Sequence, residues 1–111
     1  GIAVGASMDL ALVEGANGGL FTNYEGKAQA AVDALLKEDY DFVYVHVEAP
    51  DEMGHQGSIE KKIKAIEFLD QRVIEYIVNC LKNSGEAFCM LILPDHPTPI
   101  RVRTHTANPV P

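Results

Sequence analysis

A long helical repeat stands between two short apolar runs, and this order limits the folds that the chain can adopt. Apolar residues recur every three or four positions over residues 59–81, which is typical of one face of an amphipathic helix. Ser58 is placed to cap the first turn, and Gly85 follows the end as a stop signal. A second repeat of this kind, over residues 24–37, predicts another helix.

The two apolar runs predict strands. Residues 42–47 and 88–93 are nearly all apolar, β-branched or aromatic, which is the composition of strands buried on both faces of a parallel sheet. Helix, strand, helix and strand in this order predict an α/β fold, a parallel-sheet βαβ fragment with a right-handed crossover. Residues 8–13 and 100–102 are candidates for short strands, and the rest of the proline-rich tail should be loop.

Composition excludes some classes of partner. A net charge of -7, with no basic cluster longer than Lys61-Lys62, argues against binding to nucleic acid or to an anionic membrane surface. The chain shows no secretory signal and no long apolar span, so Cys80 and Cys89 favour a reduced, cytoplasmic compartment. We expect both thiols to be packing residues.

Acidic and histidine side chains follow both predicted strands. Asp51 and His55 come after the first strand, Asp95 and His96 come after the second, and His105 lies in the tail. Because ligands sit beyond the carboxyl ends of parallel strands, we expect these clusters to meet at one edge of the sheet. Carboxylate oxygen and imidazole nitrogen suit Zn²⁺ or Mn²⁺. Each cluster taken alone also fits a solvated loop.

These motifs together resemble a known family. The segments PDEMGHQG, PDH and RTHTANPVP, with NYEGKAQA and EKKIKAIEFLDQRV, resemble the C-terminal part of the cofactor-independent (2,3-bisphosphoglycerate-independent) phosphoglycerate mutases of the archaeal type. That family belongs to the alkaline phosphatase superfamily, so the resemblance implies a three-layer fold of that kind. It also implies a cytoplasmic enzyme of glycolysis and gluconeogenesis that interconverts 3-phosphoglycerate and 2-phosphoglycerate through a phosphoserine.

The resemblance further implies a division of the chain and a site with two divalent cations. Residues 1–20 would return from an inserted domain, and residues 21–111 would form the C-terminal part of the metal-binding phosphotransferase domain. By motif match, one cation, Mn²⁺, Zn²⁺ or Mg²⁺, would bind to Asp51, His55 and His105. The second cation would bind to Asp95 and His96.

Two further expectations concern substrate and nucleophile. Arg103 can grip the phosphate or carboxylate of the substrate with its guanidinium. No serine of the chain matches the nucleophile of the family, so we expect the isolated chain to be inactive. Two alternatives stay open: a related phosphotransferase or phosphatase on the same scaffold, or a non-enzymatic fragment that self-associates through an exposed sheet edge.

Overall fold

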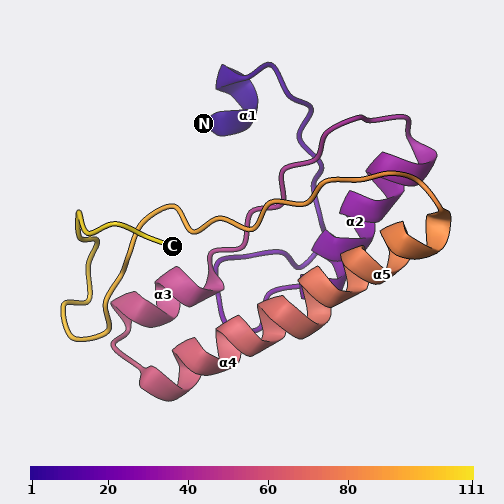
Figure 1. The fold of residues 1–111 in the computed structure, drawn as a ribbon. Helices are drawn as coiled ribbons and strands as arrows, with labels where there is room; N and C mark the ends of the chain where they lie inside the picture. Colours follow the sequence, from indigo (N-terminus) through magenta and orange to yellow (C-terminus); the bar gives the residue numbers. More distant parts are fainter.

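The computed structural model describes residues 1–111, apart from the side chain of Ile2. Figure 1 shows its helical elements, which are in chain order α1 (Ile2–Gly5), α2 (Tyr24–Lys37), α3 (Ala49–His55), α4 (Ile59–Leu69), η1 (Asp70–Ile74) and α5 (Glu75–Ser84). The last three form one long rod. α3 packs against the first part of the rod, and α2 packs against η1 and α5.

The predicted helices are confirmed, and local signals define their ends. The Asn23 side chain accepts a hydrogen bond from the Gly26 backbone N–H at 2.9 Å and so caps α2. Ser58 caps α4 by accepting a hydrogen bond from the Lys61 N–H at 3.4 Å. Gly85, with φ of 78°, ends α5 in the left-handed conformation that glycine adopts without strain.

The rod contains a π turn that the apolar period did not predict. In η1 the backbone N–H of Glu75 donates to the carbonyl oxygen of Asp70, a bond over five residues instead of four. Arg72 lies in this turn, and its guanidinium carbon is 4.9 Å from the ring centroid of Tyr24 and 4.8 Å from that of Phe68. A cation–π contact contributes about 0.5–2 kcal/mol, so Arg72 helps to hold the rod against α2.

The core lies where α2 and α3 meet the rod. It consists of Leu20, Tyr24, Ala28, Ala31, Val32, Ala49, Met53, Ala65, Val73, Ile77 and Leu81. Of the apolar face predicted for residues 59–81, Val73 and Ile77 are buried, whereas Ile59, Ile63 and Ile66 are 50–62% exposed. The predicted face is therefore buried mainly in the second half of the rod, where α2 covers it.

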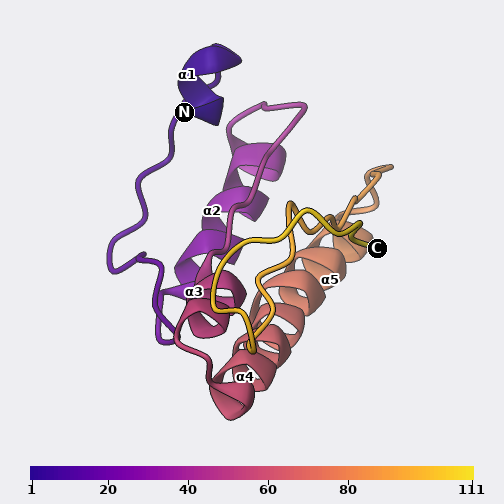
Figure 2. The ribbon, with the colours of Figure 1, turned by 90° about the vertical axis from the view of Figure 1, so that its left-hand side faces the viewer.

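The predicted parallel sheet is wrong, because none of the residues that the structure describes forms a strand. Residues 42–47 and 88–93 are extended and both run toward α3 (Figure 1), but Figure 2 shows them apart. They line one cleft of about 1840 Å³. Paired strands lie about 4.7–4.9 Å apart so that their backbone groups can bond, and no backbone hydrogen bond joins residues 42–47 to residues 88–93.

The same correction applies to the βαβ unit, to the three-layer architecture and to the short strands expected at residues 8–13 and 100–102. The first of these two segments is irregular, and the second is a turn. The three valines of residues 42–47 pack against the core, while the residues between them are more exposed. Met90 packs against the core too, but Leu91, Ile92 and Leu93 are 61–76% exposed.

Candidate metal centre

α3 carries the first two candidate ligands on one face. Pro50 stands in its first turn, where the missing N–H of proline costs no helical hydrogen bond. Asp51 and His55 are four residues apart, so one helical turn brings their side chains together. The distance from Asp51 Oδ2 to His55 Nε2 is 3.3 Å.

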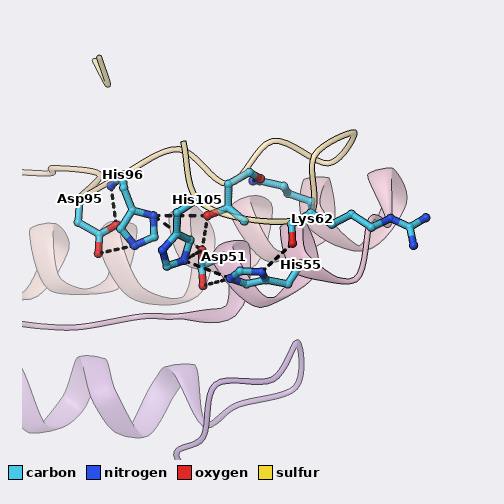
Figure 3. A network of polar contacts seen from close by, with 8 residues as sticks. Asp51, His55, Lys62, Asp95, His96 and His105 are labelled. Carbon is cyan, nitrogen blue, oxygen red and sulfur yellow. Dashed lines mark hydrogen bonds and ion pairs between the residues drawn. The ribbon is translucent and has the colours of Figure 1, made fainter. Parts of the chain in front are cut away.

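The proline-rich tail lies over α3 and brings His105 to the same place (Figure 3). Its Nε2 is 3.4 Å from Asp51 Oδ1 and 3.2 Å from His55 Nε2. One ligand atom from each of the three residues lies within 4.8 Å of the other two. The structure therefore brings together three residues of which the outermost, Asp51 and His105, are 54 positions apart in the sequence.

Asp95 and His96 lie next to this triad. His96 Nε2 is 3.4 Å from Asp95 Oδ2, and His96 Nδ1 is 4.0 Å from Asp51 Oδ1. The imidazole ring of His96 also lies against that of His105, with a centroid distance of 3.7 Å. All five candidate ligands thus gather in one cluster (Figure 3), although no sheet brings them there.

Two hydrogen bonds and one close approach, none of them expected from the sequence, fit the tail against α3 and α4. Thr98 is 3% exposed, and its hydroxyl donates to Asp51 Oδ1. The Lys62 ammonium of α4 donates to the Thr98 carbonyl oxygen at 2.8 Å. A Cβ at Gly54 would lie 2.5 Å from that same oxygen, so glycine permits the close approach. The one available signal was the position of Thr98 two residues after His96.

Arg103 contributes its main chain to the cluster. Its carbonyl oxygen lies 3.0 Å from His55 Nδ1. Because a carbonyl oxygen can only accept, Nδ1 carries the proton and the lone pair is left on Nε2, the nitrogen that faces Asp51 and His105. The Arg103 guanidinium lies over Gly57. Its role in substrate binding stays a prediction.

The charge of Asp51 suits a cation site. Burial raises the pKa of the Asp51 carboxyl. The hydrogen bond from Thr98 and the imidazoles of His55, His105 and His96 lower it by a larger amount, so the pKa lies below its ordinary value of 3.8. Asp51 is therefore an anion near neutral pH. One carboxylate and two imidazole nitrogens form a ligand set that Zn²⁺ and Mn²⁺ accept, so these residues fit a divalent cation.

Comparison with known proteins identifies the family. The family model described as the metalloenzyme superfamily matches residues 3–111. The chain belongs to the metalloenzyme superfamily. A protein of Methanosarcina mazei named 2,3-bisphosphoglycerate-independent phosphoglycerate mutase is 56% identical over 111 residues, which are 100% of this chain and 28% of that protein. A Geobacter sulfurreducens protein with the same name, marked probable, is 53% identical over 100% of this chain and 27% of its own length.

A solved structure is also similar to this metalloenzyme chain. It is a protein of Pyrococcus horikoshii with 33% identity and a TM-score of 0.70, and the match covers 94% of this chain and 26% of that one. The names of the relatives confirm the resemblance that the motifs suggested. This metalloenzyme chain spans little more than a quarter of the length of the curated relatives that it matches.

The described helices bear on the membrane question as well. Every helix in the part of the chain that the structure describes is too short or too polar to span a lipid bilayer.

Cys80 and Cys89 are both free thiols, of which Cys80 packs against the core and Cys89 is exposed. The expectation of a packing role is therefore correct for Cys80 and wrong for Cys89.

Proposed function

We propose that this chain supplies the cation-binding part of a longer 2,3-bisphosphoglycerate-independent phosphoglycerate mutase, which interconverts 3-phosphoglycerate and 2-phosphoglycerate in the cytoplasm. One observation carries the proposal: Asp51, His55 and His105 converge in a chain whose whole length is 56% identical to a protein of that name. Because the chain spans 28% of that relative, the proposed turnover belongs to the longer protein.

Each candidate ligand has a role in this proposal. Asp51, His55 and His105 hold one divalent cation, and Asp95 with His96 holds a second together with residues outside this chain. Zn²⁺ and Mn²⁺ are the preferred ions, because imidazole nitrogen suits them better than it suits Mg²⁺. When bound, a pair of such ions neutralises the charge of the transferring phosphoryl group and lowers the pKa of the attacking hydroxyl.

The remaining chemistry falls to the side chains themselves. The His55 proton on Nδ1, held by the Arg103 carbonyl oxygen, keeps Nε2 free for the cation. In the proposal the Arg103 guanidinium grips the carboxylate or phosphate of phosphoglycerate through two parallel hydrogen bonds. The serine that becomes phosphorylated lies outside these residues. Within the chain the Ser58 hydroxyl caps α4, and the Ser84 hydroxyl donates to the Leu81 carbonyl oxygen at 2.7 Å.

A chimeric enzyme tests this function. The 111 residues would replace the matching segment of the Methanosarcina mazei protein, and turnover of 3-phosphoglycerate would be followed with Mn²⁺ or Zn²⁺ added. We expect an active, cation-dependent chimera whose turnover falls at least about 100-fold in His55→Ala, because several kcal/mol of charge stabilisation depends on the cation. His46→Ala, which changes an exposed histidine outside the cluster, is the matched control.

Two results would contradict the proposal. One is a folded chimera that binds the cation but leaves phosphoglycerate unchanged while it hydrolyses other phosphomonoesters, which would favour a related phosphatase. The other is turnover that survives in both His55→Ala and His105→Ala, which would remove these residues from the mechanism.

A further inference from the structure

We propose that Thr98 is a positioning residue shared by the two cation sites: its hydroxyl donates to Asp51 and accepts from His96, and so orients one ligand of each site. This inference rests on the proposed cation-dependent function. Thr98 is 3% exposed, and its Oγ1 bonds to Asp51 Oδ1 and lies 3.4 Å from His96 Nδ1. Apart from the candidate ligands themselves, Thr98 is the one residue of the described cluster whose side chain contacts a candidate ligand of each site through a single atom.

The direction of both hydrogen bonds follows from the number of protons. A hydroxyl has one proton to donate and two lone pairs that can accept. Asp51 is an anion and can only accept, so the hydroxyl proton goes to its Oδ1. The lone pairs of Oγ1 then face His96 Nδ1, which must carry a proton to make the second bond.

This arrangement leaves the metal-binding atoms free. With the proton on Nδ1, the lone pair of His96 is on Nε2, and that nitrogen lies 3.4 Å from Asp95 Oδ2. At the other site, the bond to Thr98 holds Asp51 by Oδ1 and leaves Oδ2 facing His55 Nε2 at 3.3 Å. Hydrogen-bond partners that orient metal ligands in this way strengthen metal binding in proteins.

The backbone around Thr98 is held in place, as a positioning residue requires. Pro97 and Pro99 flank it, so the φ angles of both neighbours are fixed and Thr98 itself is restricted to extended conformations. Lys62 binds its carbonyl oxygen from α4, and Gly54 lets that oxygen approach α3. The hydroxyl is therefore presented from a rigid segment.

Zinc affinity provides the first test. The variants are Thr98→Val, which removes the hydroxyl at nearly constant shape, and Thr98→Ser, which keeps it. Thr22→Val is the matched control, because Thr22 is 2% exposed and accepts a hydrogen bond from the Asn17 N–H at 2.9 Å outside the cluster. Competition with a chromophoric chelator should show binding about 10–100-fold weaker in Thr98→Val, with wild-type affinity in Thr98→Ser and Thr22→Val.

Equal zinc affinity in Thr98→Val and the wild type would overturn the inference. So would a loss of the same size in Thr98→Val and Thr98→Ser, since binding would then respond to any change of the packed side chain and not specifically to removal of the hydroxyl. Circular dichroism of each variant establishes that the helices are retained, so that weaker binding reports on the site.

The tautomer of His96 provides a second test that needs no metal. In the metal-free chain, the ¹⁵N chemical shifts of the neutral imidazole should show the proton on Nδ1 of His96 in the wild type and in Thr98→Ser. Thr98→Val should shift the population toward Nε2–H. An unchanged tautomer in Thr98→Val would overturn the inference. If Thr98→Val shifts the tautomer but the wild-type chain binds no zinc, the proposed function alone is contradicted.

Discussion

Arg72 shows how a single charged side chain joins two helices in this protein. Its guanidinium lies over the rings of Tyr24 and Phe68, and its Nη2 is 2.7 Å from Glu25 Oε2. This hydrogen bond lowers the pKa of Glu25 below its ordinary value of 4.5 and outweighs the opposite effect of burial. The α2 surface and the π turn are thus tied together by an ion pair that depends on the charge of Glu25 and by a cation–π contact with Tyr24 that does not.

Removing that charge should change stability in a pH-dependent way. A carboxyl whose pKa is lowered by folding stabilises the folded state above its unfolded pKa, and the contribution is lost as the pH falls from 4.5 through the folded pKa. Since Glu25 is 61% exposed, we expect Glu25→Gln to cost only about 0.5 kcal/mol at neutral pH. Thermal melts of both proteins should converge in acid. A constant difference across this range would contradict the assignment.

At the scale of elements, α2 and the long rod could be predicted from the sequence, whereas α1 and α3 were not predicted and the predicted strands were wrong. A helix forms hydrogen bonds within its own backbone, so the apolar period of residues 59–81 and the cap at Ser58 are sufficient local information. A strand needs a second segment at pairing distance. Residues 42–47 and 88–93 have the composition of strands, but no backbone hydrogen bonds join the two segments. Composition alone does not show whether a segment has a pairing partner.

The candidate site divides in the same way. Asp51 and His55 could be paired from their spacing, and His105 joined them through the resemblance to a family. The contacts of Thr98 and Lys62 depend on how the tail docks against α3 and α4, and no local pattern encodes that docking. The candidate ligands could therefore be predicted from the sequence, whereas the contacts that hold the tail beside them could not.

The uneven burial of the rod leads to a matched pair of predictions. Ile77 is 5% exposed and Ile63 is 53% exposed, although both belong to the same apolar period. Ile77→Ala should lower the free energy of unfolding by about 2–5 kcal/mol, because it leaves a cavity. Ile63→Ala should change it by no more than about 0.5 kcal/mol. Denaturant unfolding measures both, and equal losses would show that the first half of the rod is also covered.

At the scale of the whole molecule, the packed helices and the cluster of candidate ligands lie in different parts of the structure. α2 and the rod form the packed part, while α3 and the tail assemble the candidate ligands near one end (Figures 1 and 3). The extended residues 88–93 lie along the open cleft with most of their apolar side chains exposed. Asp51, His55 and His105 could hold one cation, and we expect Asp95 and His96 to form part of a second site.

The isolated chain should therefore bind a cation without showing mutase turnover. Three ligands are enough for one ion with water in the fourth position, but covalent catalysis needs a nucleophile, and we expect none of the serines of this chain to serve as one. A coupled assay of the purified chain with Mn²⁺ should show no conversion of 3-phosphoglycerate. Turnover that disappears in His55→Ala would instead show that a serine within these residues, such as Ser7, acts as the nucleophile.

The central claim is that Asp51, His55 and His105 hold a divalent cation, and anomalous diffraction tests it most directly. Crystals of the chain grown with Zn²⁺ would be measured on both sides of the zinc absorption edge. We expect a peak about 2.0–2.2 Å from the Asp51 carboxylate and from Nε2 of both histidines. Zinc bound only at other residues, with no peak between these three at saturating concentration, would contradict the account.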